Sequence, residues 1–116
     1  MKMLKFAAAA ALVAASSTSA FAVQSFQNGN ALLRDCTAKN SVNQSFCLGY
    51  IEGVVDALET LRSVNGAAPC TGNGVEGGQV MDVVVKSLRE HPEGRNSAAG
   101  ALVVAAIAKA FCPGDS

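Results

Sequence analysis

Apolar residues recur at helical spacing in four segments of the chain, which predicts an all-α fold. The longest pattern runs from Ser41 to about Ser63. Ser41-x-x-Gln44 resembles a capping box at its start. One face of this helix is apolar and carries Cys47, Ile51, Val54, Leu58 and Leu61. Another side is acidic and carries Glu52, Asp56 and Glu59.

Three shorter helices are expected around the long one, at 28–36, 75–90 and 98–111. The first ends at Cys36. The second carries one apolar stripe, formed by Val80, Val84 and Leu88, and stops at His91-Pro92 because a residue before proline avoids the α region. Its valine run, 83–85, would also suit a strand, but the length of the segment favours a helix.

The last helix is the most apolar part of the chain outside the N-terminus. Asn96 or Ser97 is its expected cap, and no charged residue occurs from Ala98 to Ala108. A helix that is apolar all round is expected to be buried all round. Four short helices cannot easily enclose it, so the surplus apolar surface predicts a homodimer or another partner.

The N-terminus has the three parts of a Sec signal peptide. Met1 to Lys5 carries two lysines, Phe6 to Ala15 is apolar, and small residues lead to Ala22. The apolar run is too short for a membrane anchor. We therefore expect cleavage after Ala22, release into the periplasm without a membrane segment, and one mature domain at 23–116.

The charge of that mature domain is faintly acidic, with seven basic and nine acidic side chains. Runs of lysine or arginine are absent from the sequence. This composition makes nucleic acid and anionic lipid poor candidates for a partner.

Four cysteines in an exported chain predict two disulfides. Zinc binding and redox chemistry are disfavoured because no C-x-x-C pair occurs, and the single histidine is distant in sequence from all four cysteines. The four positions are Cys36, Cys47, Cys70 and Cys112.

Sequence alone does not choose among the three pairings of these cysteines. The predicted helices favour Cys36 with Cys47, which lie on either side of a turn. They also favour Cys70 with Cys112, which come together if the last two helices form an antiparallel hairpin. A bond between Cys47 and Cys70 would have to bridge nearly the whole long helix.

Gly49, Gly53 and Ala57 recur every four residues on the long helix and leave one face without large side chains. Each glycine costs about 1 kcal/mol relative to alanine inside a helix. The favoured explanation is close packing of a second helix inside the same core. The alternative is that this face is reserved for another chain.

Residues suited to catalysis are scarce. His91 beside a proline at a helix end is expected to be exposed or to act as a cap, and the acidic run on the long helix is expected to be a solvated face. No G-x-S-x-G, H-E-x-x-H or phosphate-binding loop occurs in the sequence. We therefore expect neither an enzyme nor a cofactor or metal site.

Several segments resemble the Rap/Tai family of type VI secretion amidase immunity proteins. These are FCLGYIEGVVDAL, the Gly74-Val75 pair, VVVKSLREHPEGR and AAGALVVAAIAKAFC. The resemblance as a whole extends over nearly all of the mature chain, from about Ala31 to Cys112. The most specific matches are Cys47-x-Gly49-Tyr50-x-x-Gly53 and His91-Pro92-Glu93.

The resemblance implies a small HdeA-like helical protein of the periplasm, commonly dimeric, that protects a bacterium from a peptidoglycan amidase. In the family, a surface loop and a neighbouring helix block the amidase cleft. Family members tend to have a proline-containing turn before the Gly-Val pair, whereas this chain has Thr71-Gly72-Asn73-Gly74. The expected contact residues are Thr71, Gly72, Asn73, Gly74, Val75 and Glu76. The acidic face of the long helix is a second candidate.

Two other functions fit the same pattern. An HdeA-like acid chaperone would loosen at low pH and expose apolar surface, although two disulfides and one histidine favour a domain that stays closed. A stand-alone periplasmic binding protein of the same fold would have an unrelated partner.

Overall fold

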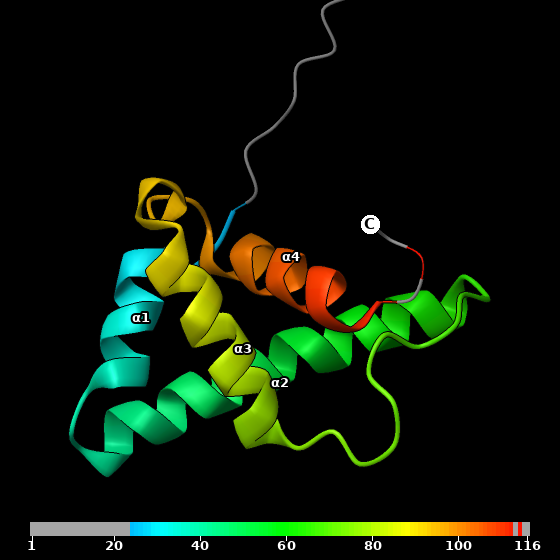
Figure 1. Ribbon diagram of the computed structural model, residues 1–116, viewed down its shortest axis with the longest axis horizontal. Coiled ribbons are helices and arrows are strands. Elements are labelled where there is room, and N and C mark those ends of the chain that lie inside the picture. Colours follow the sequence, from blue (N-terminus) through cyan, green and yellow to red (C-terminus); the bar gives the residue numbers. More distant parts are fainter. Residues whose placement is uncertain (1–23, 113, 115–116) are drawn as a thin grey trace, which may run out of the picture.

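The computed structural model describes residues 24–112 and 114, and within them the fold is all-α. The helices are α1 (Gly29–Thr37), α2 (Ser41–Val64), α3 (Gly77–Glu90) and α4 (Ala99–Phe111), with a 3₁₀ turn, η1 (Pro92–Gly94), before α4 (Figure 1). The predicted signal peptide, 1–22, lies outside the described residues. No described helix combines the length and hydropathy that a membrane span needs.

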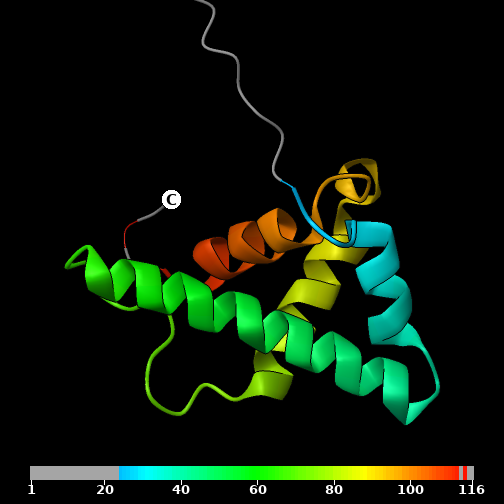
Figure 2. The same cartoon turned by 180° about the vertical axis from the view of Figure 1, so that it is seen from behind.

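The long helix α2 is the base on which the other three helices pack (Figures 1 and 2). Helices α1 and α3 cross one half of α2, and α4 lies over the other half. Helix α3 also contacts both α1 and α4. Each short helix therefore buries its apolar stripe against at least two neighbours.

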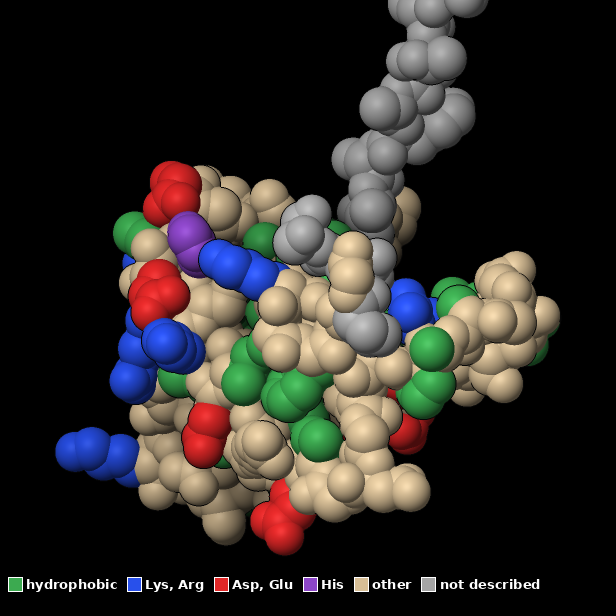
Figure 3. All heavy atoms as spheres, turned by 45° about the vertical axis from the view of Figure 1, so that its right-hand side comes forward, with side chains coloured by type: hydrophobic (Ala, Val, Ile, Leu, Met, Phe, Trp, Pro, Cys, Tyr) green, Lys and Arg blue, Asp and Glu red, His purple; other side chains and the backbone are tan. Residues whose placement is uncertain are grey.

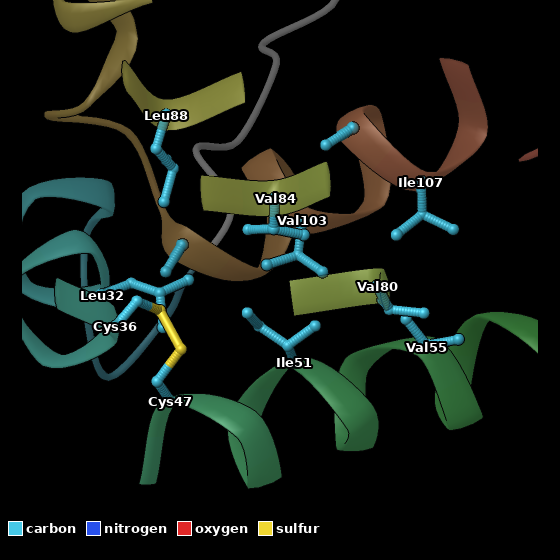
Figure 4. Packing of buried hydrophobic residues seen from close by; sticks show 12 residues of the cluster. Leu32, Cys36, Cys47, Ile51, Val55, Val80, Val84, Leu88, Val103 and Ile107 are labelled. Carbon is cyan, nitrogen blue, oxygen red and sulfur yellow. A yellow bond between two sulfur atoms is a disulfide. The ribbon is translucent and has the colours of Figure 1, made fainter. Parts of the chain in front are cut away.

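The buried core draws on all four helices (Figure 4). The predicted stripe of α3 is confirmed, since Val80, Val84 and Leu88 are all buried. The α2 stripe is confirmed at its N-terminal end only: Cys47 and Ile51 are fully buried, but Leu61 is exposed. The remaining large buried residues are Leu32 on α1, Val55 on α2, and Val103 and Ile107 on α4.

Both disulfides join the cysteines that the helix arrangement favoured. Cys36 at the end of α1 bonds to Cys47 in α2, with a Cα–Cα distance of 5.0 Å (Figure 4). Cys70 before α3 bonds to Cys112 after α4, and no free cysteine is present among the described residues. The two bonds close α1 onto α2 and hold the start of the α3–α4 hairpin to its end.

The helix caps differ from those predicted for α2 and α4. Asn28 caps α1, with its side chain accepting from the Ala31 amide at 2.9 Å. The proposed capping box is wrong: Asn40, not Ser41, caps α2, and the Gln44 amide donates to the Ala38 carbonyl. The side chain of Asn40, one residue before Ser41, accepts a hydrogen bond from the backbone N–H of Asn43 and so caps the helix.

The predicted cap of α4 is also wrong. Neither Asn96 nor Ser97 caps this helix, whose N-cap residue is Ala98 with no side-chain hydrogen bond. Instead, the Ser97 carbonyl accepts from the Gly29 amide and the Ala99 amide donates to the Gln27 carbonyl. The chain before α1 thus pairs with the chain before α4 and satisfies backbone groups that a cap would otherwise serve.

Candidate partner-binding surfaces

The loop between α2 and α3 begins with a tight reversal held by Arg62. The Ala67 amide donates to the Arg62 carbonyl at 2.9 Å, and Arg62 Nε donates to the Ala68 carbonyl at 2.7 Å. Gly66 adopts a positive φ of 69°, which a residue with a side chain would rarely take. The loop therefore leaves α2 in a defined direction.

Cys70 is the second anchor of this loop and lies in the protein interior. Besides its disulfide to Cys112, its backbone amide donates to Glu59 Oε1 at 2.9 Å and to Oε2 at 3.2 Å. The Thr71 amide also donates to Glu59 Oε1, at 3.2 Å. One carboxylate on α2 thus receives two successive loop amides.

The predicted contact segment divides into an exposed tip and two half-buried flanks. Gly72, Asn73 and Gly74 are exposed, and the chain turns there with a bond from the Val75 amide to the Gly72 carbonyl at 3.3 Å. Thr71 and Val75 are half-buried, and Val75 packs against the core. Glu76 is exposed as the N-cap residue of α3. The tip projects freely while its flanks are fixed (Figure 1).

A shallow recess of about 230 Å³ lies beside the tip. Glu52 and Asp56 stand on one side of it, Thr71 and Val75 on the other, and Val55 and Val80 also contribute. Two members of the predicted acidic face therefore border the loop. The third, Glu59, is not part of a solvated face as expected, because it is committed to the loop backbone.

An apolar groove of about 870 Å³ lies along the outer side of the α2–α4 pair. It contains no charged side chain, and the residues that line it are Gly49, Tyr50, Gly53, Val54, Ala57, Leu58, Leu61, Gly100, Ala101, Val104 and Ala105. Such a surface suits contact with another apolar surface.

This groove corrects the favoured explanation for the glycines of α2. Gly49, Gly53 and Ala57 are exposed, and a Cβ atom added at either glycine would meet no atom within 4 Å. Close packing inside the core is therefore wrong. The core side of α2 is the face with Cys47, Ile51 and Val55, and the glycine face points away from it.

The groove also corrects the expectation that α4 is buried all round. Val103 and Ile107 are buried, but Val104 is 37% exposed and Ala105 is exposed as well. The helix has an inner and an outer apolar face because the other three helices cover only one side of it. Its outer face is part of the groove wall.

The geometry around the single histidine fits the structural role predicted for it. His91 follows α3 as its C-cap residue, its side chain is largely exposed, and its Nδ1 lies 3.3 Å from Glu93 Oε1. Within 24–112 and 114, no three His, Cys, Asp or Glu side chains are grouped so that they could hold a metal ion.

Charged side chains of both signs are interspersed on the face in Figure 3, with hydrophobic side chains gathered between them. A continuous positive stripe, which would track a nucleic-acid backbone, is not seen on that face. The two surfaces with distinctive form are thus the anchored loop and the apolar groove.

The sequence predicted the loop as a contact segment, but it offered the glycine face as a surface for another chain only as the alternative to core packing. It did not predict how either surface is built. Glu59 and Arg62 fix the loop, and nothing in their helical spacing distinguishes them from solvated side chains. Their role becomes visible only in the folded chain, which brings the Glu59 carboxylate to the Cys70 amide.

Comparison with known families gives one match. The model of a family described as Rap1a immunity proteins matches residues 28–112, which include all four helices and both disulfides. No curated protein and no solved structure is similar enough to the chain to count as a match.

Proposed function

The chain belongs to the Rap1a immunity protein family, and from this premise we propose that it binds a peptidoglycan amidase delivered by type VI secretion and blocks its active-site cleft. The inhibitor would act by occlusion, without catalysis, cofactor or metal. The toxin acts on the cell wall, so the proposed site of action is the periplasm.

The observation that carries this proposal is the α2–α3 loop, with its exposed tip and anchored flanks. The tip, 72–74, stands between the Glu59 and disulfide anchors on one side and the start of α3 on the other. A segment held in this way loses less conformational entropy on binding than a free loop would. Entry into an enzyme cleft requires such a stiff protrusion.

The two disulfides support an exported location for this scaffold. Structural disulfides persist in oxidising compartments such as the periplasm and are rare in the cytosol. The predicted signal peptide leads to the same compartment. Determining the N-terminal residue of the periplasmic protein would test cleavage after Ala22.

Loop replacement tests the occlusion proposal. Residues 71–76 are exchanged for an unrelated sequence of equal length, and inhibition of a purified type VI secretion peptidoglycan amidase that the parent protein inhibits is measured. We expect inhibition to fall at least tenfold, which corresponds to a loss of about 1.4 kcal/mol of binding free energy. Residues at the centre of an interface often contribute more than this.

The matched control for that exchange is Lys86→Ala with Glu90→Ala. These residues form an exposed ion pair on α3, away from the loop, and their removal is expected to leave inhibition unchanged. Full inhibition by the loop-exchanged protein, with its helix content intact, would reject the loop as the contact surface.

We further propose that the apolar groove between α2 and α4 receives the same groove of a second copy. Apart from Tyr50, both walls consist of small or aliphatic residues, so two copies related by a two-fold axis could bring their helices close together. This occupant accounts for two glycines, Gly49 and Gly53, that cost helix stability although the monomer leaves room for a side chain at both positions.

Val104→Glu tests the dimer. A carboxylate placed in an apolar interface is costly to desolvate, so the variant should sediment as a monomer where the parent sediments as a dimer. Val42→Glu is the control, because Val42 is 75% exposed on α2 and lies outside the groove. A parent protein that remains monomeric at high micromolar concentration would contradict the proposal.

A further inference from the structure

We propose that Glu59 is a positioning residue that sets the direction of the toxin-binding loop. This inference rests on the proposed function, because it assigns to Glu59 the orientation of the segment that would contact the amidase. The role is indirect, since the Glu59 carboxylate faces the loop backbone.

Three hydrogen bonds join the Glu59 carboxylate to the loop backbone. Glu59 Oε1 accepts from the Cys70 and Thr71 amides at 2.9 and 3.2 Å, and Oε2 accepts from Cys70 at 3.2 Å. Hydrogen bonds to an ionised acceptor are about twice as strong as neutral ones. Glu59 is half-buried, which limits competition from water.

The disulfide alone does not supply the same constraint. It fixes the position of Cys70 relative to Cys112 but leaves the backbone torsions that follow Cys70 free to rotate. Two successive amides directed at one carboxylate fix the orientation of two successive peptide planes. The chain therefore leaves Cys70 in one direction.

The location of this constraint in the sequence matters. Gly72 and Gly74 follow Thr71, and glycine backbones have wide conformational freedom. The last position at which the path of the tip can be set before these glycines is therefore the Cys70–Thr71 pair. Without the carboxylate, the tip would sample more conformations and pay a larger entropy cost on binding.

The test compares Glu59→Ala and Glu59→Gln with the parent, using the mature, disulfide-bonded protein. Two quantities are measured on the same samples: amide hydrogen exchange at Cys70 and Thr71, and affinity for a purified type VI secretion peptidoglycan amidase. For Glu59→Ala we expect both amides to exchange at least tenfold faster and the amidase Kd to rise about tenfold. Glu59→Gln keeps one acceptor oxygen without the charge and should fall between parent and alanine.

Asp82→Asn is the matched control, because it removes an exposed carboxylate on α3 in place of the half-buried one on α2. It should change neither quantity. Unfolding measured for every variant separates a local change in the loop from a general loss of structure.

The possible outcomes separate the two proposals. Unchanged exchange at both amides overturns the positioning role, even if affinity falls, because Glu59 would then contact the toxin directly. Faster exchange with unchanged affinity also overturns it, since the loop orientation would not matter for binding. If the parent does not bind the amidase, the proposed function fails, and the exchange data alone decide whether Glu59 orders the loop.

Discussion

Gly29 lies at the tightest backbone crossing among the described glycines, where α1 begins against the chain that leads into α4. A Cβ atom added there would lie 2.5 Å from Leu102 Cδ1 and 3.0 Å from the Arg95 carbonyl oxygen. The leucine could move, but the Arg95 backbone is held by the bond from the Asn30 amide to the Arg95 carbonyl. The position therefore needs a residue without a side chain.

Gly29→Ala is accordingly expected to lower the free energy of unfolding by about 1–3 kcal/mol, the usual cost of overpacking. Urea unfolding followed by circular dichroism measures it. Gly78→Ala is the control: no atom lies within 4 Å of the added Cβ, so this change should be neutral or stabilise α3 by up to about 1 kcal/mol. Equal stability of the two variants would show that the crossing is looser than described.

Single residues were the least predictable level of this protein. The roles of Gly29 and Glu59 depend on partners 66 and 11 residues away in the chain, Arg95 and Cys70. Local rules also failed where two neighbouring polar residues competed, as Asn40 and Ser41 did for the cap of α2. Sequence patterns identify which residues could act, and the fold determines which of them do.

At the scale of elements, periodicity predicted all four helices because each buries one apolar stripe. The predicted and observed starts of α3 differ by two residues. The Val75 amide donates to the Gly72 carbonyl in a turn, and the Val75 side chain packs on the core from the loop, not from the helix. The disulfide pairing followed from the helix order. Once α3 and α4 run antiparallel, their outer ends bring Cys70 to Cys112.

The relation between α2 and α4 was harder to foresee. Small residues at every fourth position indicate that a surface can be approached closely, but they do not identify the neighbour that approaches it. Likewise, the apolar character of α4 indicates that the helix is buried, but it does not indicate how much of its surface the other helices of the same chain can cover. The groove exists because the other three helices cover only one face of α4 and leave its outer face open beside α2.

At the scale of the whole molecule, the charged side chains lie where their protonation in acid should change the stability of the fold little. Among residues 24–112 and 114, no polar or charged residue is buried. The pKa of Glu93 is held below its usual value of 4.5, chiefly by a hydrogen bond from its own backbone amide and next by one from the His91 side chain. Glu93 is exposed, so this interaction is screened by water.

The sign of this effect follows from linkage. Because the pKa of Glu93 is lower in the folded state, its carboxylate adds stability above about pH 4.5, and that contribution is lost as the pH falls through the folded-state pKa. We therefore expect the contribution of Glu93 to the urea midpoint to be constant from about pH 7 to about pH 5 and to fall slightly below that. Glu93→Gln should remove the part of the decline that comes from this residue.

The same titration distinguishes an inhibitor from an acid-activated chaperone. A rigid inhibitor should retain its helical circular dichroism at about pH 3 and bind little of a dye that reports exposed apolar surface. A chaperone should loosen there, bind the dye strongly and suppress aggregation of an unfolded client. One disulfide joins α1 to α2, and the other joins the segment before α3 to the residue after α4. Since these bonds persist in acid and no charged residue is buried among the described residues, we expect the first result. Strong dye binding with client protection at low pH would favour the chaperone function over immunity.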